Sequence, residues 1–233
     1  MKRIRAGRGM AVAAAAATAL VGIVLTTPSV ASAGPTPTYW VNNAVSAVGG
    51  NGTSCSAPGY TTIQAAINVA ESSATGIIDV CPGTYPEQLQ VTAPSTFLTI
   101  QPASPGGGVT VEVPSTPSDS TSLCDTAPGT GAYQPDQDGV VVCGSNTTNV
   151  VMTGLTLDEA WPSGTCDDSL FGVLVGGGST FRLTHSAITA GGAVPINGCQ
   201  GGVAVQVGMA WTTPVEVGHA ILSYDTISGY QKN

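Results

Sequence analysis

A two-part pattern occurs three times in the second half of this chain and constrains its fold more than any other feature. Each copy opens with a glycine and three apolar residues, and a longer strand-like run follows. The openings are residues 139–142, 172–175 and 202–205, and the runs are residues 150–157, 181–188 and 220–227. The openings lie 33 and 30 residues apart. A period of this length is typical of a solenoid, in which each repeat buries its apolar face only against its neighbours.

The same period predicts where the next repeat would start. A fourth opening glycine would fall at about residue 234, one position beyond Asn233. We therefore expect a single domain over residues 34–233 that is truncated at its C-terminal end. Such a truncation would leave apolar ladder ends uncovered, which favours association or a lost cap.

The N-terminal segment has the three parts of a secretion signal. Its basic start consists of Lys2, Arg3, Arg5 and Arg8. An apolar segment spans residues 11–25, and residues 31–33 form a small-x-small cleavage pattern. We expect cleavage between Ala33 and Gly34, which makes the protein secreted and extracellular, without membrane association afterwards. An uncleaved membrane anchor is the alternative, but the apolar segment is short for one.

Cleavage would leave 200 of the 233 residues, enough for one domain with a core. Only Arg182 and Lys232 would then oppose 14 acidic residues, so the net charge would fall from −8 to −12. Nucleic acids and anionic lipids bind through clusters of Lys and Arg. The charge therefore excludes a nucleic-acid partner, and it would repel a polyanionic substrate unless a divalent cation intervened.

The predicted mature chain has an even number of cysteines, which in an exported protein indicates disulfides. They are Cys55, Cys81, Cys124, Cys143, Cys166 and Cys199. None has the C-x-x-C spacing of a zinc site or a redox dithiol. Six cysteines allow 15 pairings. Pairing between neighbours in sequence predicts Cys55–Cys81, Cys124–Cys143 and Cys166–Cys199.

One helix and several short strands are expected before the repeats. The helix is predicted over residues 61–74, because Thr61 and Gln64 have capping-box spacing and apolar residues recur on one face. Strands are predicted at residues 39–41, 76–80, 89–91, 97–100 and 109–113. A loose leader, a loop, a turn and a long loop are predicted at residues 34–38, 43–60, 81–85 and 116–138.

Alternation within the repeats predicts which side chains face inward. Met152, Leu183 and Leu222 form one predicted internal ladder, and Leu157, Ile188 and Ile227 form another. A hydroxyl ladder of Thr153, Thr184 and Ser223 is expected to face outward.

The opening strands are apolar on both faces. Val140, Val173 and Val203 should point inward, as should Val142, Val175 and Val205. The residues between them, Val141, Leu174 and Ala204, are apolar too. A strand of this kind is normally covered on both sides, and the expected cover is the insertions that carry Trp161, Cys166 and Cys199. An exposed binding stripe is the alternative.

The segment before the repeats resembles a known family. Tyr60-Thr61-Thr62-Ile63-Gln64-Ala65-Ala66-Ile67, then Val80 and Pro82-Gly83-Thr84-Tyr85-Pro86-Glu87, is similar to the opening of pectinesterases and of many exported bacterial proteins with a right-handed parallel β-helix, the pectin lyase-like fold. The resemblance runs from about Tyr39 to the C-terminus. It implies an all-β, single-stranded right-handed parallel β-helix whose N-terminal end is capped by an α-helix, with Ile63, Ala66 and Ile67 filling the core of the first coil.

The catalytic motifs of that family do not carry over. The aspartates, arginine and glutamines of pectinesterases have no counterparts here. Polygalacturonase-like enzymes use an Asn-Thr-Asp segment, an Asp-Asp pair and a Gly-His-Gly, of which only the pair Asp167-Asp168 is present. Pectate lyase-like enzymes use calcium-binding carboxylates and an arginine base, and Arg182 is the only arginine in the predicted mature chain.

Several residues are nevertheless candidates for chemistry. Asp167, Asp168, Arg182 and His185 are the catalytic candidates, and His219 is a second histidine that could titrate near neutral pH. His185 aligns with Gly154 and Tyr224 at a bend. For each of these residues a solvated or structural role is the alternative.

Calcium is the one cofactor that the sequence suggests, and its candidate ligands are Asp136, Asp138, Asp158 and Glu159. The later ligands of an EF-hand loop are missing after Asp136-Gln137-Asp138-Gly139. Trp40, Trp161, Trp211, Tyr85, Tyr133 and Tyr224 could stack on sugar rings.

Two functions are compatible with these observations. The first is a non-catalytic surface, adhesion or glycan-binding module whose partner is a polysaccharide or a cell-surface glycan. The second, implied only by the resemblance, is a lyase, hydrolase or esterase acting on pectin-like acidic glycans, with an active site that could lie beyond Asn233. The weakly charged repeat faces and the missing motifs favour the first, although a fold alone does not decide function.

Overall fold

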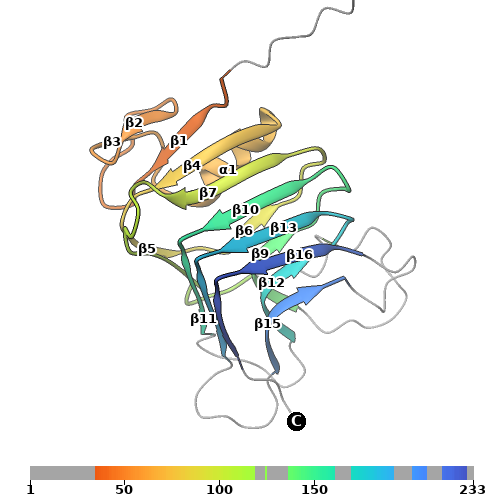
Figure 1. Cartoon of the computed structure of the whole chain (residues 1–233). Coiled ribbons are helices and arrows are strands. Elements are labelled where there is room, and N and C mark those ends of the chain that lie inside the picture. Colours follow the sequence, from red (N-terminus) through yellow and green to blue (C-terminus); the bar gives the residue numbers. More distant parts are fainter. Residues whose placement is uncertain are drawn as a thin grey trace, which may run out of the picture. The chain divides into compact units, whose positions relative to one another are not determined.

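The computed structural model describes residues 35–118, 124, 136–160, 169–191, 201–208 and 217–229. The chain divides into two units, Met1–Gly34 and Pro35–Asn233, and all of the described residues belong to the second. That unit is built mainly from three parallel β-sheets (Figure 1).

The three sheets have six, five and four strands, and every strand pair within them is parallel. The six-stranded sheet contains β1 (Thr38–Val41), β4 (Thr75–Val80), β7 (Phe97–Pro102), β10 (Asn149–Thr153), β13 (Thr180–Thr184) and β16 (His219–Ser223). The five-stranded sheet contains β5 (Gly83–Pro86), β8 (Val109–Glu112), β11 (Thr156–Ala160), β14 (Ala187–Gly191) and β17 (Thr226–Gly229). The four-stranded sheet contains β6 (Leu89–Val91), β9 (Asp136–Val142), β12 (Ser169–Val175) and β15 (Gly201–Val207).

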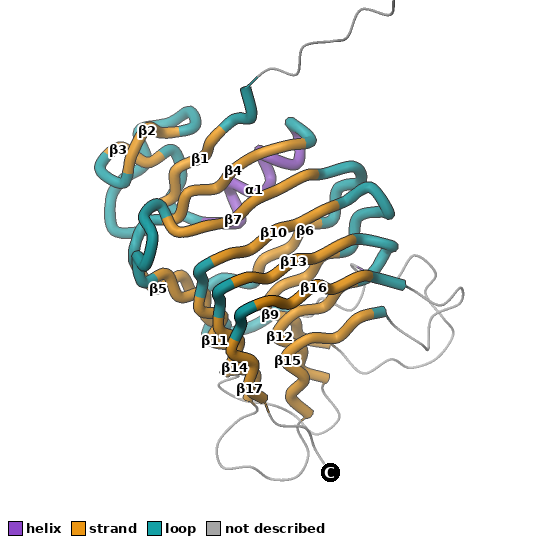
Figure 2. The backbone as a smooth tube through the Cα atoms, in the orientation of Figure 1, coloured by secondary structure: helices purple, strands orange, loops and turns teal. Residues whose placement is uncertain are grey.

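The chain enters the three sheets in rotation, so that β9, β10 and β11 lie in different sheets and β12 returns to the sheet of β9 (Figure 2). We call each such group of three strands a coil. The sequence pattern predicted two strands in each repeat, whereas the structure has three. The reason is that a turn at Gly154, His185 and Tyr224 divides each longer run between two sheets.

Strand register confirms the predicted ladders. Met152 pairs with Leu183, which pairs with Leu222, and Leu157, Ile188 and Ile227 align in the same way. The ladders also extend into earlier coils, which lack the glycine opening: Ile78 and Ile100 continue the first, and Tyr85 and Val111 continue the second. Alternation of inward and outward side chains therefore persists where the sequence repeat is no longer visible.

The last described coil differs from the coil before it in exposure. Leu222 is 39% exposed and Ile227 is 44% exposed, whereas Leu183 and Ile188, one coil earlier in the same ladders, are 0% exposed.

The register predicted for the third opening is wrong by two residues. Val173 pairs with Val205 rather than Val203, and Leu174 pairs with Gln206 rather than Ala204. Val203 therefore does not point inward; it packs against the cluster outside the four-stranded sheet. The valines repeat so uniformly along this segment that a slip of two preserves the apolar pattern.

The outer face of the four-stranded sheet is covered where its strands are apolar. Val141 and Leu174 are buried in a second cluster with Cys124, Cys143 and Phe171. These two residues therefore do not form an exposed binding stripe. The insertions that carry Trp161, Cys166 and Cys199 lie outside the described residues.

Helix α1 (Ile63–Ser72) packs against the first strands and extends the main core. Its buried face consists of Ile63, Ala66, Ile67 and Ala70, as predicted. The helix begins later than expected, because Thr62 and not Thr61 is the N-cap and accepts a hydrogen bond from the N–H of Ala65. The carboxylate of Glu87 accepts the N–H groups of Ile63 and Gln64, both at 2.9 Å.

Three segments predicted as loops or a turn contain strand residues. Residues 43–60 include the antiparallel pair β2 (Gly52–Ser54) and β3 (Ala57–Pro58), β5 begins inside the predicted turn at residues 81–85, and β9 begins at Asp136 inside the predicted long loop at residues 116–138. In β5 the Tyr85 ring lies in the core and its hydroxyl donates to the carbonyl of Cys81 at 2.8 Å. Proline and glycine at positions 82 and 83 resembled a turn, but pairing of β5 with β8 decides the local structure.

Two of the predicted disulfides are present, Cys55–Cys81 and Cys124–Cys143. They fit an oxidising compartment. Cys166 and Cys199 lie outside the described residues. In the part of the chain that is described, no helix is long and apolar enough to cross a membrane.

Candidate functional site

One turn position places aromatic side chains at the surface of neighbouring coils. Gly154, His185 and Tyr224 follow β10, β13 and β16, and we call them the turn row. All three have positive φ angles, 68°, 52° and 61°. The backbone links them, since the N–H of Gly154 donates to Thr184 and the N–H of His185 donates to Ser223.

The rings of His185 and Tyr224 stack on each other. Their centroids are 5.0 Å apart and their planes are inclined by only 15°. The separation matches the spacing of about 4.8 Å between neighbouring strands of a sheet. Tyr224 is 85% exposed, so its ring is available to a ligand.

The positive φ angles of His185 and Tyr224 are unfavourable for residues that carry a side chain. A positive φ brings the Cβ of an ordinary residue close to the backbone, which costs about 1 kcal/mol, whereas glycine avoids this strain. Glycine occupies the position in one coil and an aromatic residue in the next two. Because Tyr224 is exposed, burial in the core does not compensate for its strain. Strained exposed residues of this kind are candidates for function.

Asp225 fixes the turn that carries Tyr224. Its two carboxylate oxygens accept the N–H groups of Ser186 and Ser223, each at 2.8 Å. One bond joins the turn to the preceding coil and the other closes the turn itself. The aromatic pair therefore stands on a backbone that is held in place.

A pocket of about 310 Å³ opens beside the turn row, in the coils that precede His185. It is lined by Asp79, Gln101, Pro102, Ala103, Pro105, Gly106, Thr153 and Gly154. Gly154 contributes no side chain, which leaves open the position that His185 and Tyr224 fill in the next two coils. A volume near 300 Å³ is at the lower end of the range for small-ligand sites.

The polar groups of this pocket belong to one column on the outward face of the six-stranded sheet. Asp79 pairs in register with Gln101, whose amide donates to the Asp79 carboxylate at 2.9 Å. Thr153 comes next, followed by Thr184 and Ser223, which are aligned with it. The predicted outward hydroxyl ladder therefore runs from the pocket to the base of the turn row.

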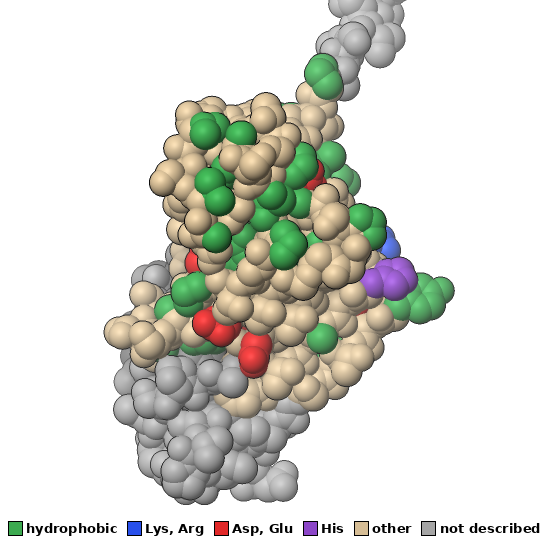
Figure 3. Space-filling model, turned by 90° about the vertical axis from the view of Figure 1, so that its left-hand side faces the viewer, with side chains coloured by type: hydrophobic (Ala, Val, Ile, Leu, Met, Phe, Trp, Pro, Cys, Tyr) green, Lys and Arg blue, Asp and Glu red, His purple; other side chains and the backbone are tan. Residues whose placement is uncertain are grey.

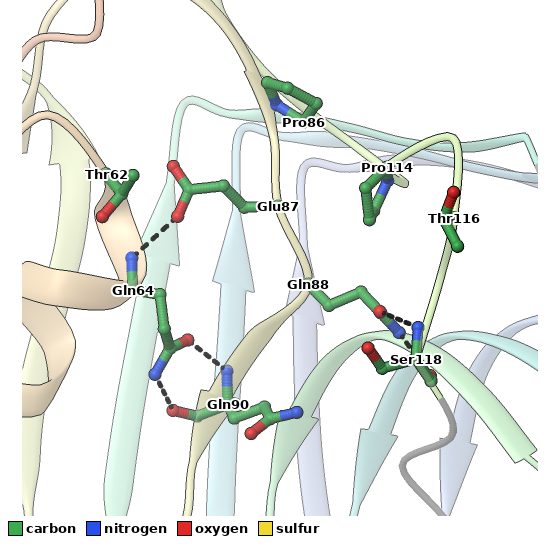
Figure 4. A pocket seen from close by; sticks show the side chains of 9 residues that line it. All are labelled: Thr62, Gln64, Pro86, Glu87, Gln88, Gln90, Pro114, Thr116 and Ser118. Carbon is green, nitrogen blue, oxygen red and sulfur yellow. Dashed lines mark hydrogen bonds between the residues drawn. The ribbon is translucent and has the colours of Figure 1, made fainter.

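A second pocket, of about 370 Å³, lies between α1 and β6, and its polar groups already bond to one another (Figure 4). Gln64 accepts the N–H of Gln90 and donates to its carbonyl. Gln88 accepts the N–H of Ser118 and donates to the carbonyls of Ser118 and Asp138. Burial raises the pKa of Glu87, and its two bonds from the helix N–H groups oppose that rise. These side chains hold the helix to the sheets, so we favour the first pocket.

The structure separates the catalytic candidates. Arg182 is exposed on the outward face of β13, in register with Val151 and Ile221 as predicted. His219 begins β16, at the end of the strand opposite the turn row. Asp167 and Asp168 lie outside the described residues. Arg182 thus lies on β13 and His185 in the turn that follows it, and no described carboxylate pairs with either.

The calcium candidates are also divided. Asp158 lies on the outward face of β11 and is partly exposed, whereas Glu159 and Asp138 are fully buried. The backbone of Asp136 begins β9. Within the described residues, no three His, Cys, Asp or Glu side chains are placed to hold a metal ion.

Of the aromatic candidates, Tyr224 alone is strongly exposed among the described ones. Trp40 is partly buried beside Asp79, and Tyr85 is buried in the core, so the prediction that Tyr85 could stack on a sugar is wrong. Trp161, Trp211 and Tyr133 lie outside the described residues. The repeat alignment places His185 and Tyr224 at the same position of neighbouring coils, and the structure adds that their rings stack.

No protein-family model, no curated protein and no solved structure matches this chain. On the face shown in Figure 3, acidic and basic side chains are few among the described residues, and apolar side chains, other uncharged side chains and backbone predominate. A surface of this composition suits an uncharged polar ligand.

Proposed function

We propose that the three stacked sheets form a single-stranded right-handed parallel β-helix of the pectin lyase-like kind, with α1 as its N-terminal cap. Parallel register from coil to coil and the position of α1 against the first core residues support this architecture. The chain would be exported by the signal of residues 1–33, in keeping with its disulfides.

The function that this geometry supports best is non-catalytic glycan binding. The observation that carries the proposal is the stacked pair of His185 and Tyr224 next to a pocket lined by hydroxyl, amide and carboxylate groups. Sugar rings present apolar C–H faces and polar edges. An exposed aromatic ring suits the faces, and the Asp79–Gln101 pair with the hydroxyl ladder suits the edges.

Binding without cleavage is favoured over hydrolysis because hydrolysis of a glycosidic bond requires two carboxylates placed across it. Asp79 is the one carboxylate in the pocket lining, and the Gln101 amide already bonds to it.

Binding should be measured by calorimetry of the secreted protein with soluble oligosaccharides chosen from a polysaccharide pull-down panel. We expect a Tyr224→Ala variant to weaken binding of the selected glycan about tenfold, which is the loss of one stacking contact. Gln101→Ala should weaken it as well. Phe97→Ala is the matched control, since Phe97 is 55% exposed on the same sheet but at the other end of its strand.

Equal binding by wild type and Tyr224→Ala would reject the turn row as the site. Release of reducing or unsaturated sugar from any polymer of the panel would favour the enzymatic alternative instead.

A further inference from the structure

The pocket beside the turn row contains a carboxylate with a free oxygen. Asp79 lies on the outward face of β4, is partly exposed, and contributes the one acidic side chain of the pocket lining. The amide of Gln101 donates to its Oδ1 atom at 2.9 Å. Among the described residues, no donor bonds to the Oδ2 atom of Asp79. The pocket therefore offers a ligand one negatively charged acceptor.

No positive side chain among the described residues is placed to balance this charge. The pocket lining contains no lysine, arginine or histidine. Arg182 is the only lysine or arginine in the described ranges, and it lies on β13, three strands from β4 in the six-stranded sheet. At about 4.8 Å per strand this separation is about 14 Å, which exceeds the Debye length of about 8 Å at physiological salt. A ligand that reaches Asp79 can thus supply the missing positive charge.

An indole side chain follows Asp79 in the same column of the sheet. Trp40 on β1 pairs in register with Asp79, and both residues lie on the outward face, where Trp40 is partly exposed. In-register residues of neighbouring strands leave the sheet about 5 Å apart. The ring of tryptophan attracts cations more strongly than the rings of tyrosine and phenylalanine. A carboxylate with an indole neighbour favours an ammonium group over a neutral hydroxyl.

The rest of the pocket lining is uncharged. Thr153 contributes a hydroxyl group, Gly154 contributes backbone, and Pro102 and Pro105 contribute apolar rings. These groups suit the neutral ring and hydroxyls of a sugar, so that Asp79 alone selects for charge. The chain as a whole is acidic, with 14 acidic residues against six lysines and arginines, and a protein of this charge repels polyanions such as chains of uronic acids.

Resting on the glycan-binding function proposed above, we infer that the pocket takes a sugar that carries a protonated amine, as in chains of glucosamine. The ammonium group donates to the Asp79 carboxylate, and the sugar hydroxyls bond to the Gln101 amide and the Thr153 hydroxyl. The pocket volume of about 310 Å³ suits one sugar residue of a chain. The exposed ring of Tyr224, two coils beyond Gly154, is available to another residue of the same chain. The partner is thus a cationic amino-sugar polymer and not a pectin-like polyanion.

The test is titration calorimetry of the secreted protein, at a pH at which the amine is protonated, with a glucosamine oligomer and the N-acetylated oligomer of the same length. N-acetylation removes the positive charge and keeps the ring and the linkage. We expect the glucosamine oligomer to bind about tenfold more tightly or better, because it gains a charge-assisted bond. Asp79→Asn should remove this preference, and its amide oxygen can still accept the bond from Gln101, so the variant should fold. Asp158→Asn, which removes the same charge from the outward face of β11, should retain the preference.

Equal affinity of wild type for the two oligomers, or no affinity for the glucosamine oligomer, would overturn the amino-sugar assignment. The glycan-binding function would still stand if another glycan bound and Tyr224→Ala weakened that binding. A preference that Asp79→Asn keeps, or that Asp79→Asn and Asp158→Asn reduce equally, would overturn the assignment as well, since it would then not come from the pocket. If neither oligomer and no polysaccharide of the panel bound, the assignment and the glycan-binding function would both be overturned.

Discussion

Glu87 caps a helix that begins 24 residues before it: its Oε1 accepts the N–H of Ile63 at 2.9 Å, and its Oε2 accepts the N–H of Gln64. The first N–H groups of a helix have no partners within the helix, and the helix dipole favours a negative charge there. Glu87 stands at the end of the segment that resembles the openings of β-helix proteins. Its role is thus to hold the N-terminus of α1 to the chain that follows β5.

Replacement of Glu87 by alanine should therefore destabilise the protein by about 2–3 kcal/mol, since two helix N–H groups lose a charged acceptor. Glu87→Gln should lose less, because its amide oxygen still accepts one bond. Urea unfolding monitored by circular dichroism measures both. Glu112→Ala, which removes an outward carboxylate of β8, is the control and should change the unfolding free energy by about 0.5 kcal/mol or less. Equal losses in Glu87→Ala and Glu112→Ala would contradict the capping role.

The hydroxyl of Tyr85 should lose its proton at a higher pH than the hydroxyl of an exposed tyrosine. Burial raises its pKa to about 12, with a smaller contribution from the charge of Glu87. Because the folded pKa is raised, the stability that the neutral phenol contributes is complete below pH 10 and is lost as the pH rises toward 12. Ultraviolet titration of tyrosinate should show one group in wild type with a midpoint near 12 that is missing from Tyr85→Phe. A difference spectrum with a midpoint near 10 would place the hydroxyl in water.

The sequence predicts those parts of the fold in which local spacing decides whether a side chain points inward or outward. It does not predict the parts that depend on pairing with a distant strand. Met152, Leu183 and Leu222 are each followed by a hydroxyl residue at the same repeat position, so their ladder followed from the repeat alignment, and the apolar face of α1 followed from helical periodicity. The register of Val205 did not, because a valine lies at every second position of that strand. β5 was missed because its pairing with β8 joins residues far apart in sequence.

The site was harder to predict than the fold. His185 and Tyr224 were aligned from the repeat, yet nothing in the sequence indicates that their rings stack or that a pocket opens beside Gly154. Asp158 and Glu159 are neighbours with the same chemistry, and only the position of the β11 strand sends one outward and the other inward.

The third disulfide remains a prediction. With Cys55–Cys81 and Cys124–Cys143 formed, Cys166 and Cys199 are the two cysteines left, and the oxidising compartments in which disulfides persist favour their pairing as well. Peptide mapping without reduction should recover a fragment that links Cys166 to Cys199. Labelling of either cysteine by a thiol reagent in the native protein would contradict the pairing.

Substitutions in the turn row should change the unfolding free energy of the protein in the absence of any ligand. Gly154 has a φ of 68°, and a Cβ there would meet the ring of Pro102 at 3.3 Å. Gly154→Ala should therefore lower the unfolding free energy by about 1 kcal/mol or slightly more. His185→Gly, one coil later, relieves the same backbone strain but loses the stacking on Tyr224, so the two effects should nearly cancel. Chemical unfolding of both variants tests this contrast. A large loss in His185→Gly together with no loss in Gly154→Ala would show that the stack itself, rather than the backbone conformation, holds the turn.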